Sequence, residues 1–112
     1  MIIKTRHTGL VVKDIEKSIK FYEELGLQVW KREFEKGEFL SKVVGINGAE
    51  IETAKLKIDD GSLLELLEYK SHPTSPSNEN YSSNKHGCSH VAFTVKNIEE
   101  TSLKIKKLGG SI

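Results

Sequence analysis

Two stretches of the chain carry nearly the same pattern: HTGLVVKDIEKSIKFYEELGLQV, residues 7–29, and HVAFTVKNIEETSLKIKKLGGSI, residues 90–112. Laid over each other without a gap, they share a histidine, several apolar residues, charged residues and a glycine. The identical pairs are His7/His90, Val12/Val95, Lys13/Lys96, Ile15/Ile98, Glu16/Glu99, Leu25/Leu108 and Gly26/Gly109. Each copy begins at a histidine in an apolar run and ends at a glycine after a helical pattern. The repeat predicts one strand–helix unit used twice.

The two predicted strands each place their histidine on the face that carries small residues. In the first, over residues 3–12, alternation puts His7, Gly9 and Val11 on the face opposite Leu10 and Val12. In the second, His90 shares its face with two small residues, and three apolar residues point the other way; these are Ala92 and Thr94, and Val91, Phe93 and Val95. Small neighbours leave room for another group above the predicted sheet.

The two predicted helices have equivalent end signals. Asp14 and Asn97 are suited to the N-cap position, where a side-chain oxygen accepts an amide hydrogen of the first turn. Gly26 and Gly109 follow the last helical positions, where a left-handed conformation is often needed and glycine adopts it freely. Apolar residues recur between these ends at helical spacing and predict one buried stripe on each helix.

Between the copies the pattern predicts three more strands and a linker. The strands cover residues 27–35, 49–58 and 62–69, with a short helical turn within 36–45 and a tight Asp-Asp-Gly turn at 59–61. The last strand, SLLELLEY, contains strong helix formers, but it follows a tight turn and is too short for a separate helix. We therefore predict a first βαβββ module in residues 1–70, a linker in 71–86, and the start of a second module in 87–112.

The composition excludes several classes of protein. A net charge of +1, with lysines interleaved among glutamates, gives no strong attraction to nucleic acid or to a membrane surface. No apolar run approaches the length of a membrane span, and no signal-peptide pattern opens the chain. The single cysteine, Cys88, has no partner for an internal disulfide, which favours a reducing, cytoplasmic location.

Three residues could form a metal site. His7 and His90 occupy equivalent positions of the repeat, and Glu65 lies in a run of leucines, where an ionised carboxylate needs a compensating charge. Two imidazoles and one carboxylate suit a borderline divalent metal such as zinc, nickel, cobalt, iron or manganese. Equivalent positions on two related strands would bring the two histidines toward one centre.

Structural interpretations of the same residues remain open on the pattern alone. A lone histidine in a strand is more often a hydrogen-bonded structural residue than a ligand. Glu65 could be a carboxylate on a solvent-facing side of the sheet, and Glu68 is its natural competitor as a site residue. His72 and His86 fall in or beside the predicted linker, where we expect them to be solvated.

A resemblance to a known family favours the metal site. The stretch from residues 7–29, the segment LLELLEY and the segment GCSHVAFTVKNIEE together resemble the vicinal oxygen chelate superfamily of glyoxalases, bleomycin-resistance proteins and extradiol dioxygenases. The likeness implies an α+β fold in which paired βαβββ modules form a curved mixed sheet around one divalent metal. It places the family's metal ligands on His7, Glu65 and His90. The long separation of Glu65 from His90 is similar to methylmalonyl-CoA epimerases, whereas a glutamate at this position is similar to glyoxalase I.

The resemblance also implies a part that this sequence does not contain. The second module of the family continues through three more strands, and the last of them carries a fourth ligand, usually a glutamate that is also a catalytic base. The chain stops at Ile112, so the second module is incomplete and that glutamate would lie beyond Ile112. We expect a fragment or a missing tail rather than a partner chain that supplies the missing wall, because a half-module would expose unpaired strand edges.

The function implied by this resemblance is a metal-dependent isomerase or lyase that moves a proton next to a carbonyl, through a metal-stabilised enolate or ene-diolate. Its expected substrate is a small molecule of the thioester or hemithioacetal class, and family members commonly form homodimers. Two alternatives have the same fold: a ring-cleaving iron dioxygenase, and a metal-free binding or resistance protein in which the histidines line the pocket.

Overall fold

The computed structural model describes residues 1–73 and 83–111. The chain divides into two compact units, Met1–Pro73 and Thr74–Ile112, which are described separately below. The part of the predicted linker at residues 74–82 lies outside the described residues, as does residue 112. No helix in the described part of the chain is long and apolar enough to cross a membrane.

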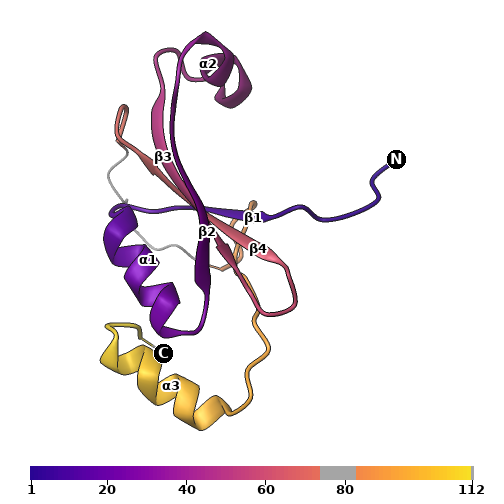
Figure 1. The fold of residues 1–112 in the computed structure, drawn as a ribbon, viewed down its shortest axis with the longest axis vertical. Coiled ribbons are helices and arrows are strands. Elements are labelled where there is room, and N and C mark those ends of the chain that lie inside the picture. Colours follow the sequence, from indigo (N-terminus) through magenta and orange to yellow (C-terminus); the bar gives the residue numbers. More distant parts are fainter. Residues whose placement is uncertain (74–82, 112) are drawn as a thin grey trace. The chain divides into compact units, whose positions relative to one another are not determined.

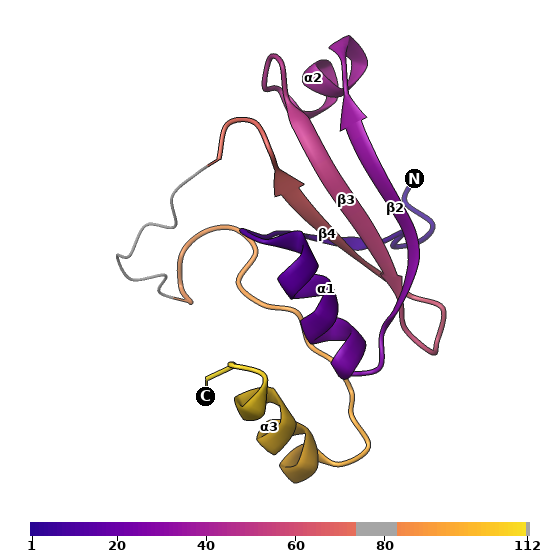
Figure 2. The same cartoon turned by 60° about the vertical axis from the view of Figure 1, so that its left-hand side comes forward.

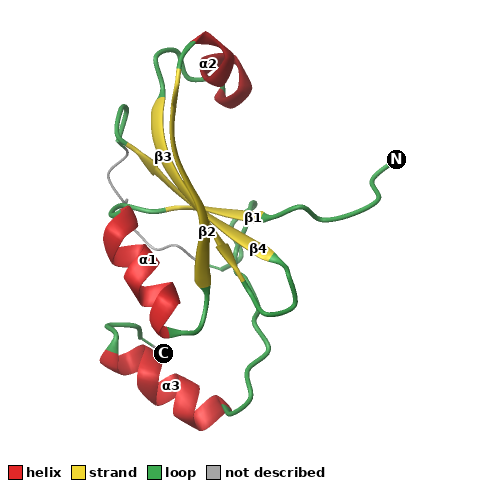
Figure 3. Cartoon of the chain, viewed as in Figure 1, coloured by secondary structure: helices red, strands yellow, loops and turns green. Residues whose placement is uncertain are grey.

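The first unit is a four-stranded mixed sheet with two helices (Figures 1 and 3). Its elements in chain order are β1 (Thr8–Val11), α1 (Ile15–Glu24), β2 (Gln28–Lys36), α2 (Glu38–Val44), β3 (Glu50–Lys57) and β4 (Leu63–Tyr69). The strand order across the sheet is β1-β4-β3-β2, so the sheet is open. β1 runs parallel to β4, and the other pairs are antiparallel. The predicted α+β fold and the βαβββ order are confirmed, with α2 as the expected helical turn.

Helix α1 has the ends that its sequence predicts. The Asp14 side chain accepts a hydrogen bond of 3.0 Å from the Lys17 amide, which satisfies one of the free donors of the first turn. At the other end Gly26 has a φ of 101°, a conformation that residues with a side chain rarely adopt. This turn lets the Leu27 amide reach back to the Tyr22 carbonyl at 3.1 Å, and the chain then enters β2.

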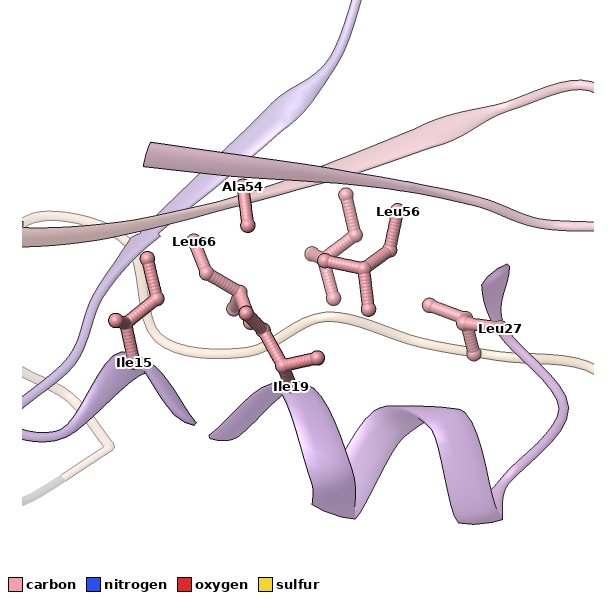
Figure 4. Packing of buried hydrophobic residues seen from close by; sticks show 7 residues of the cluster. Ile15, Ile19, Leu27, Ala54, Leu56 and Leu66 are labelled. Atoms are coloured by element: carbon pink, nitrogen blue, oxygen red, sulfur yellow. The ribbon is translucent and has the colours of Figure 1, made fainter. Parts of the chain in front are cut away.

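The hydrophobic core lies between α1 and one face of the sheet (Figures 2 and 4). Ile15 and Ile19 of the helix point toward the strands, where they pack against residues of β3 and β4. The sheet and loop members of this cluster are Leu27, Ala54, Leu56, Leu64 and Leu66. Fully burying one such side chain contributes about 1.5–3 kcal/mol. The middle of one sheet face is therefore occupied by the core, and the side chains of the other face point away from α1.

The segment LLELLEY is a strand, as predicted, because it pairs on both sides. β4 lies between β1 and β3, and its alternation sends Leu64 and Leu66 into the core. The preceding turn is closed by hydrogen bonds between the Ile58 amide and the Ser62 carbonyl at 2.9 Å and between the Gly61 amide and the Ile58 carbonyl at 2.9 Å. Pairing on both sides outweighs the helix propensity of leucine and glutamate.

The first predicted strand is shorter than expected. It covers only Thr8–Val11 instead of residues 3–12, because its partner β4 pairs with it only from Thr8↔Leu64 to Val11↔Leu67. Residues outside the reach of the partner have no ladder to join. The helix-to-strand boundaries elsewhere in the first unit fall within two residues of the predicted ones.

The second unit contains one helix, α3 (Ile98–Lys107), within its described residues (Figure 1). Its ends repeat those of α1: Asn97 accepts from the Glu100 amide at 3.0 Å, and Gly109 has a φ of 96°. The strand predicted over residues 90–95 is wrong, because these residues are not in a strand and pair with no other described segment. A sequence with strand propensity forms a strand only when a partner completes its hydrogen bonds.

Candidate metal centre

The candidate site lies on the face of the sheet opposite α1. Glu65 stands near the middle of β4, and the register places it beside Gly9 of β1 on one side and Lys55 of β3 on the other. Since alternate residues of a strand share a face, Glu65 points away from the core that Leu64 and Leu66 enter. The central strands therefore hold this carboxylate on a rigid support.

His7 reaches Glu65 from the segment that leads into β1. It precedes Gly9 by two residues and so belongs to the same face. His7 Nε2 lies 3.6 Å from Glu65 Oε1, and the two side chains are 31% and 14% exposed. Gly9, the register partner of Glu65, has no side chain; a Cβ there would lie 3.3 Å from Leu67 Cδ1. Glycine at this position therefore leaves room for the Leu67 side chain on this face of the sheet.

Lys55 contacts the other oxygen of the same carboxylate. Lys55 Nζ lies 3.6 Å from Glu65 Oε2, and this lysine side chain is 24% exposed, compared with 55% for Lys31 on the neighbouring strand. The sequence predicted that a carboxylate among leucines needs compensation, and Lys55 supplies the positive charge. The sequence analysis did not identify Lys55, although the predicted hairpin contains the signal. Lys55 and Glu65 are each five residues from Asp60 in the turn, so a hairpin centred there pairs them across β3 and β4.

The geometry of His7 and Glu65 fits two ligands of a divalent metal. Metal–nitrogen and metal–oxygen bonds of about 2.1 Å in tetrahedral geometry place two donor atoms about 3.4 Å apart, close to the observed 3.6 Å. His7 Nδ1 is buried and has no hydrogen-bond partner in the described part of the chain. A buried imidazole nitrogen without a partner is unfavourable, and such a residue is a candidate for binding a further group.

The third predicted ligand belongs to the second unit. His90 is exposed, and its Nδ1 lies 2.7 Å from the Ser89 hydroxyl oxygen. Within residues 1–73 and 83–111, no three histidine, cysteine or carboxylate side chains are gathered closely enough to hold an ion. The structure thus brings together two of the three predicted ligands, His7 and Glu65. The assignment of all three to one metal stays a prediction.

Glu68, the competitor of Glu65, has a structural role on the helix-bearing side. Its Oε1 accepts from the amide of Ile15 at 3.4 Å, at the start of α1, and its Oε2 forms an ion pair with Lys70. The hydrogen bond that the Lys70 ammonium donates to Glu68 raises the pKa of Lys70. His72 and His86 are exposed, as expected for solvated residues. These contacts separate the two glutamates of β4 by face and by partner.

Lys55 has an opposite charge beside it on one neighbouring strand and a like charge beside it on the other. Lys55 has Glu65 opposite it on β4 but Lys31 opposite it on β2. Lys31 in turn contacts Glu33 at 2.6 Å, and that hydrogen bond, more than the added charge of Lys55, lowers the pKa of Glu33. Two lysines directly opposite each other on neighbouring strands are destabilising. Each lysine of the Lys31/Lys55 pair therefore has its own carboxylate partner, Glu33 and Glu65 respectively.

Comparison with known proteins identifies relatives of the chain. The model of one family, the Glyoxalase/Bleomycin resistance protein/Dioxygenase superfamily, matches residues 4–112. No match was found among curated protein sequences.

Several solved structures have the same fold. A glyoxalase family protein from Bacillus cereus is 29% identical, with a TM-score of 0.87 over 97% of this chain and 74% of its own. A fosfomycin resistance protein from Listeria monocytogenes, solved as a complex with Mn(II) and sulfate, is 20% identical, with a TM-score of 0.63 over 97% of this chain and 74% of its own. A glyoxalase family protein from Enterococcus faecalis is 22% identical, with a TM-score of 0.63 over 95% of this chain and 72% of its own.

Proposed function

Because the chain belongs to the Glyoxalase/Bleomycin resistance protein/Dioxygenase superfamily, we propose that it provides the metal site of an isomerase or lyase that moves a proton next to a carbonyl. The observation that carries this proposal is the pair of His7 Nε2 and Glu65 Oε1, 3.6 Å apart on the face of the sheet that α1 leaves free. The metal would be divalent, and the Mn(II) bound by the Listeria monocytogenes relative supports that class of ion.

His7, Glu65 and His90 are the proposed ligands. Glu65 is held by β4 and His7 by the segment that leads into β1, and His90 comes from the equivalent position of the second copy of the repeat. A bound divalent metal stabilises negative charge on the oxygens of a substrate carbonyl, which makes a neighbouring C–H bond more acidic. Within the chain, Glu65 supplies a negative charge that offsets part of the charge of the metal. None of these three ligands is proposed as the residue that transfers the proton.

The substrate in this proposal is a small thioester or hemithioacetal, handled in the cytoplasm by a homodimer. These finer assignments rest on the family resemblance, and the substrate class and the reaction can be tested together. Incubation of the full chain in D₂O with candidate thioesters, followed by NMR, measures exchange of the proton next to the carbonyl. Exchange that requires an added divalent metal is the expected result, and metal-dependent oxygen uptake without exchange would instead indicate a dioxygenase.

Metal content gives the first test of the proposal. After dialysis against a divalent metal and removal of the excess, elemental analysis should find about one ion per chain in the wild-type protein and substantially less in His7→Ala and Glu65→Gln. His72→Ala is the matched control, since it removes an exposed histidine and should leave the metal content unchanged. A wild-type protein that holds no divalent ion would overturn the proposal and favour a metal-free binding protein.

A further inference from the structure

We propose that Lys55 binds a negatively charged group of the substrate next to the metal, and that Glu65 positions its ammonium group. The inference deepens the proposed function and rests on it. It makes Lys55 a determinant of specificity, and it assigns the substrate to the class of small molecules that carry a carboxylate, phosphate or phosphonate beside the oxygens that the metal would bind.

The position of Lys55 is the first observation. Its register partner is Glu65 on β4, so its side chain leaves the sheet on the same face as Glu65 and Gly9. The ammonium nitrogen lies 3.6 Å from Glu65 Oε2, while His7 Nε2 lies 3.6 Å from Oε1 of the same carboxylate. An imidazole and a cation thus contact the two oxygens of one carboxylate.

Local charge is the second observation. Lys55 faces Lys31 across the pair β2–β3, and Lys31 is already matched by Glu33. As the chain stands, Glu65 is the counter-ion of Lys55. A divalent ion on Glu65 would take over that carboxylate and leave Lys55 beside a second centre of positive charge. An anionic group of the substrate restores the balance, because it interacts favourably with both the ammonium and the metal.

Partial burial is the third observation. The Lys55 side chain is 24% exposed, and its strand neighbours Ala54 and Leu56 are fully buried on the opposite face. A lysine head held in such a place is less screened by solvent than one at the surface, so its interaction with an anion is stronger. Lys57 is the contrasting case on the same strand face: it is exposed, and its ammonium lies 5.8 Å from the centre of the Trp30 ring.

The test uses Mn(II) and inorganic phosphate with the full chain. Electron paramagnetic resonance measures Mn(II) binding, and the relaxation of the ³¹P signal by bound Mn(II) measures phosphate binding beside the ion. Lys55→Met should still bind Mn(II), with an affinity about two- to tenfold higher because a competing cation is removed. Its affinity for phosphate should fall at least about tenfold, because the ammonium that binds the anion is lost. Lys55→Arg should restore most of the phosphate affinity, and the control Lys57→Met should bind both probes as the wild type does.

The outcomes separate this inference from the proposed function. If the wild type binds no Mn(II), the proposed function fails and the inference fails with it. If Mn(II) binds but phosphate binds the same in wild type and Lys55→Met, the inference alone is overturned. Loss of Mn(II) binding in a folded Lys55→Met protein also overturns it, because Lys55 would then serve to hold Glu65 in place for the metal rather than to bind an anion.

Discussion

The two helices of the repeat have the same ends but very different surroundings. In α1 the first residue, Ile15, is 1% exposed, whereas its equivalent in α3, Ile98, is 64% exposed. None of the residues of α3 is buried. The difference shows that the repeat encodes a helix with its caps, while burial of that helix depends on the sheet formed by residues 28–69 in the first unit.

Local hydrogen bonds are the same in both copies. The Leu27 amide reaches the Tyr22 carbonyl at 3.1 Å, and the Gly110 amide reaches the Ile105 carbonyl at 2.9 Å, at equivalent positions of the repeat. Both patterns end a helix through a glycine with positive φ. Features that depend on a few neighbouring residues are thus reproduced without the sheet, and features that depend on packing are not.

The largest expected difference between the copies is in packing. Ile15→Ala should lower the free energy of unfolding of the first unit by about 2–5 kcal/mol, because it leaves a cavity among buried side chains. Ile98→Ala should change stability by less than about 0.5 kcal/mol, because that side chain is exposed. Urea denaturation followed by circular dichroism measures both. Equal losses in the two variants would mean that α3 is packed as α1 is.

The glycines should respond alike in the two copies. Gly26→Ala and Gly109→Ala should each destabilise their own helix end by about 1–2 kcal/mol, because an added side chain disfavours positive φ. No atom lies within 4 Å of the added Cβ at either position, so the cost is conformational rather than a clash. Hydrogen exchange of the amides in the last turns of α1 and α3 measures the effect. A loss in one copy alone would break the equivalence of the two ends.

The N-caps give a smaller, paired effect. Asp14→Ala and Asn97→Ala should each cost about 1 kcal/mol of helix stability, because each removes the acceptor of a first-turn amide. Asp14→Asn and Asn97→Asp are the matched controls, since both keep an acceptor oxygen. Faster hydrogen exchange at the Lys17 and Glu100 amides should appear only in the alanine variants, and unchanged exchange there would show that these caps are not formed in solution.

The smallest expected effect is acid sensitivity at the turn before β4. Hydrogen bonds from the Ser62 hydroxyl and amide hold the pKa of Asp60 below its usual 3.8. A carboxyl with a lowered folded-state pKa contributes stability above its usual pKa and loses that contribution as the pH falls through the lower, folded value. Amides of the β3–β4 turn should therefore exchange faster below pH 4 in the wild type, with less change in Asp60→Ala. An acid response of the same size in Asp60→Ala would assign it to other carboxylates.

The sequence predicted most of the fold because local signals and periodicity coincide in it. The capping of Asp14 and Asn97, the turn at residues 59–61 and the assignment of LLELLEY to a strand were all readable from residue types and spacing. The strand predicted over residues 90–95 failed because its propensity needs a partner strand, which a linear pattern does not reveal.

The candidate site could be predicted only in part. His7 and Glu65 were found because one lies on a small-residue face and the other is a charge among leucines, and the structure brings them together. Lys55 was missed, since a lysine in a strand looks like any surface cation until the register places it opposite Glu65. The sequence could not decide between Glu65 and Glu68 as the site residue. The contact of Glu68 with the start of α1 decides it, and that contact depends on tertiary packing.

The proposal that the two copies contribute equivalent histidines to one metal is tested most directly by Mn(II) titration of four proteins. These are the wild type, His7→Ala, His90→Ala and the double variant. One shared ion predicts a stoichiometry of one, a loss of at least about tenfold in affinity for each single variant, and a double variant much less impaired than the product of the two losses. Two results would contradict the proposal: a wild-type Mn(II) affinity in His90→Ala, or a loss of affinity in the double variant equal to the product of the two single losses.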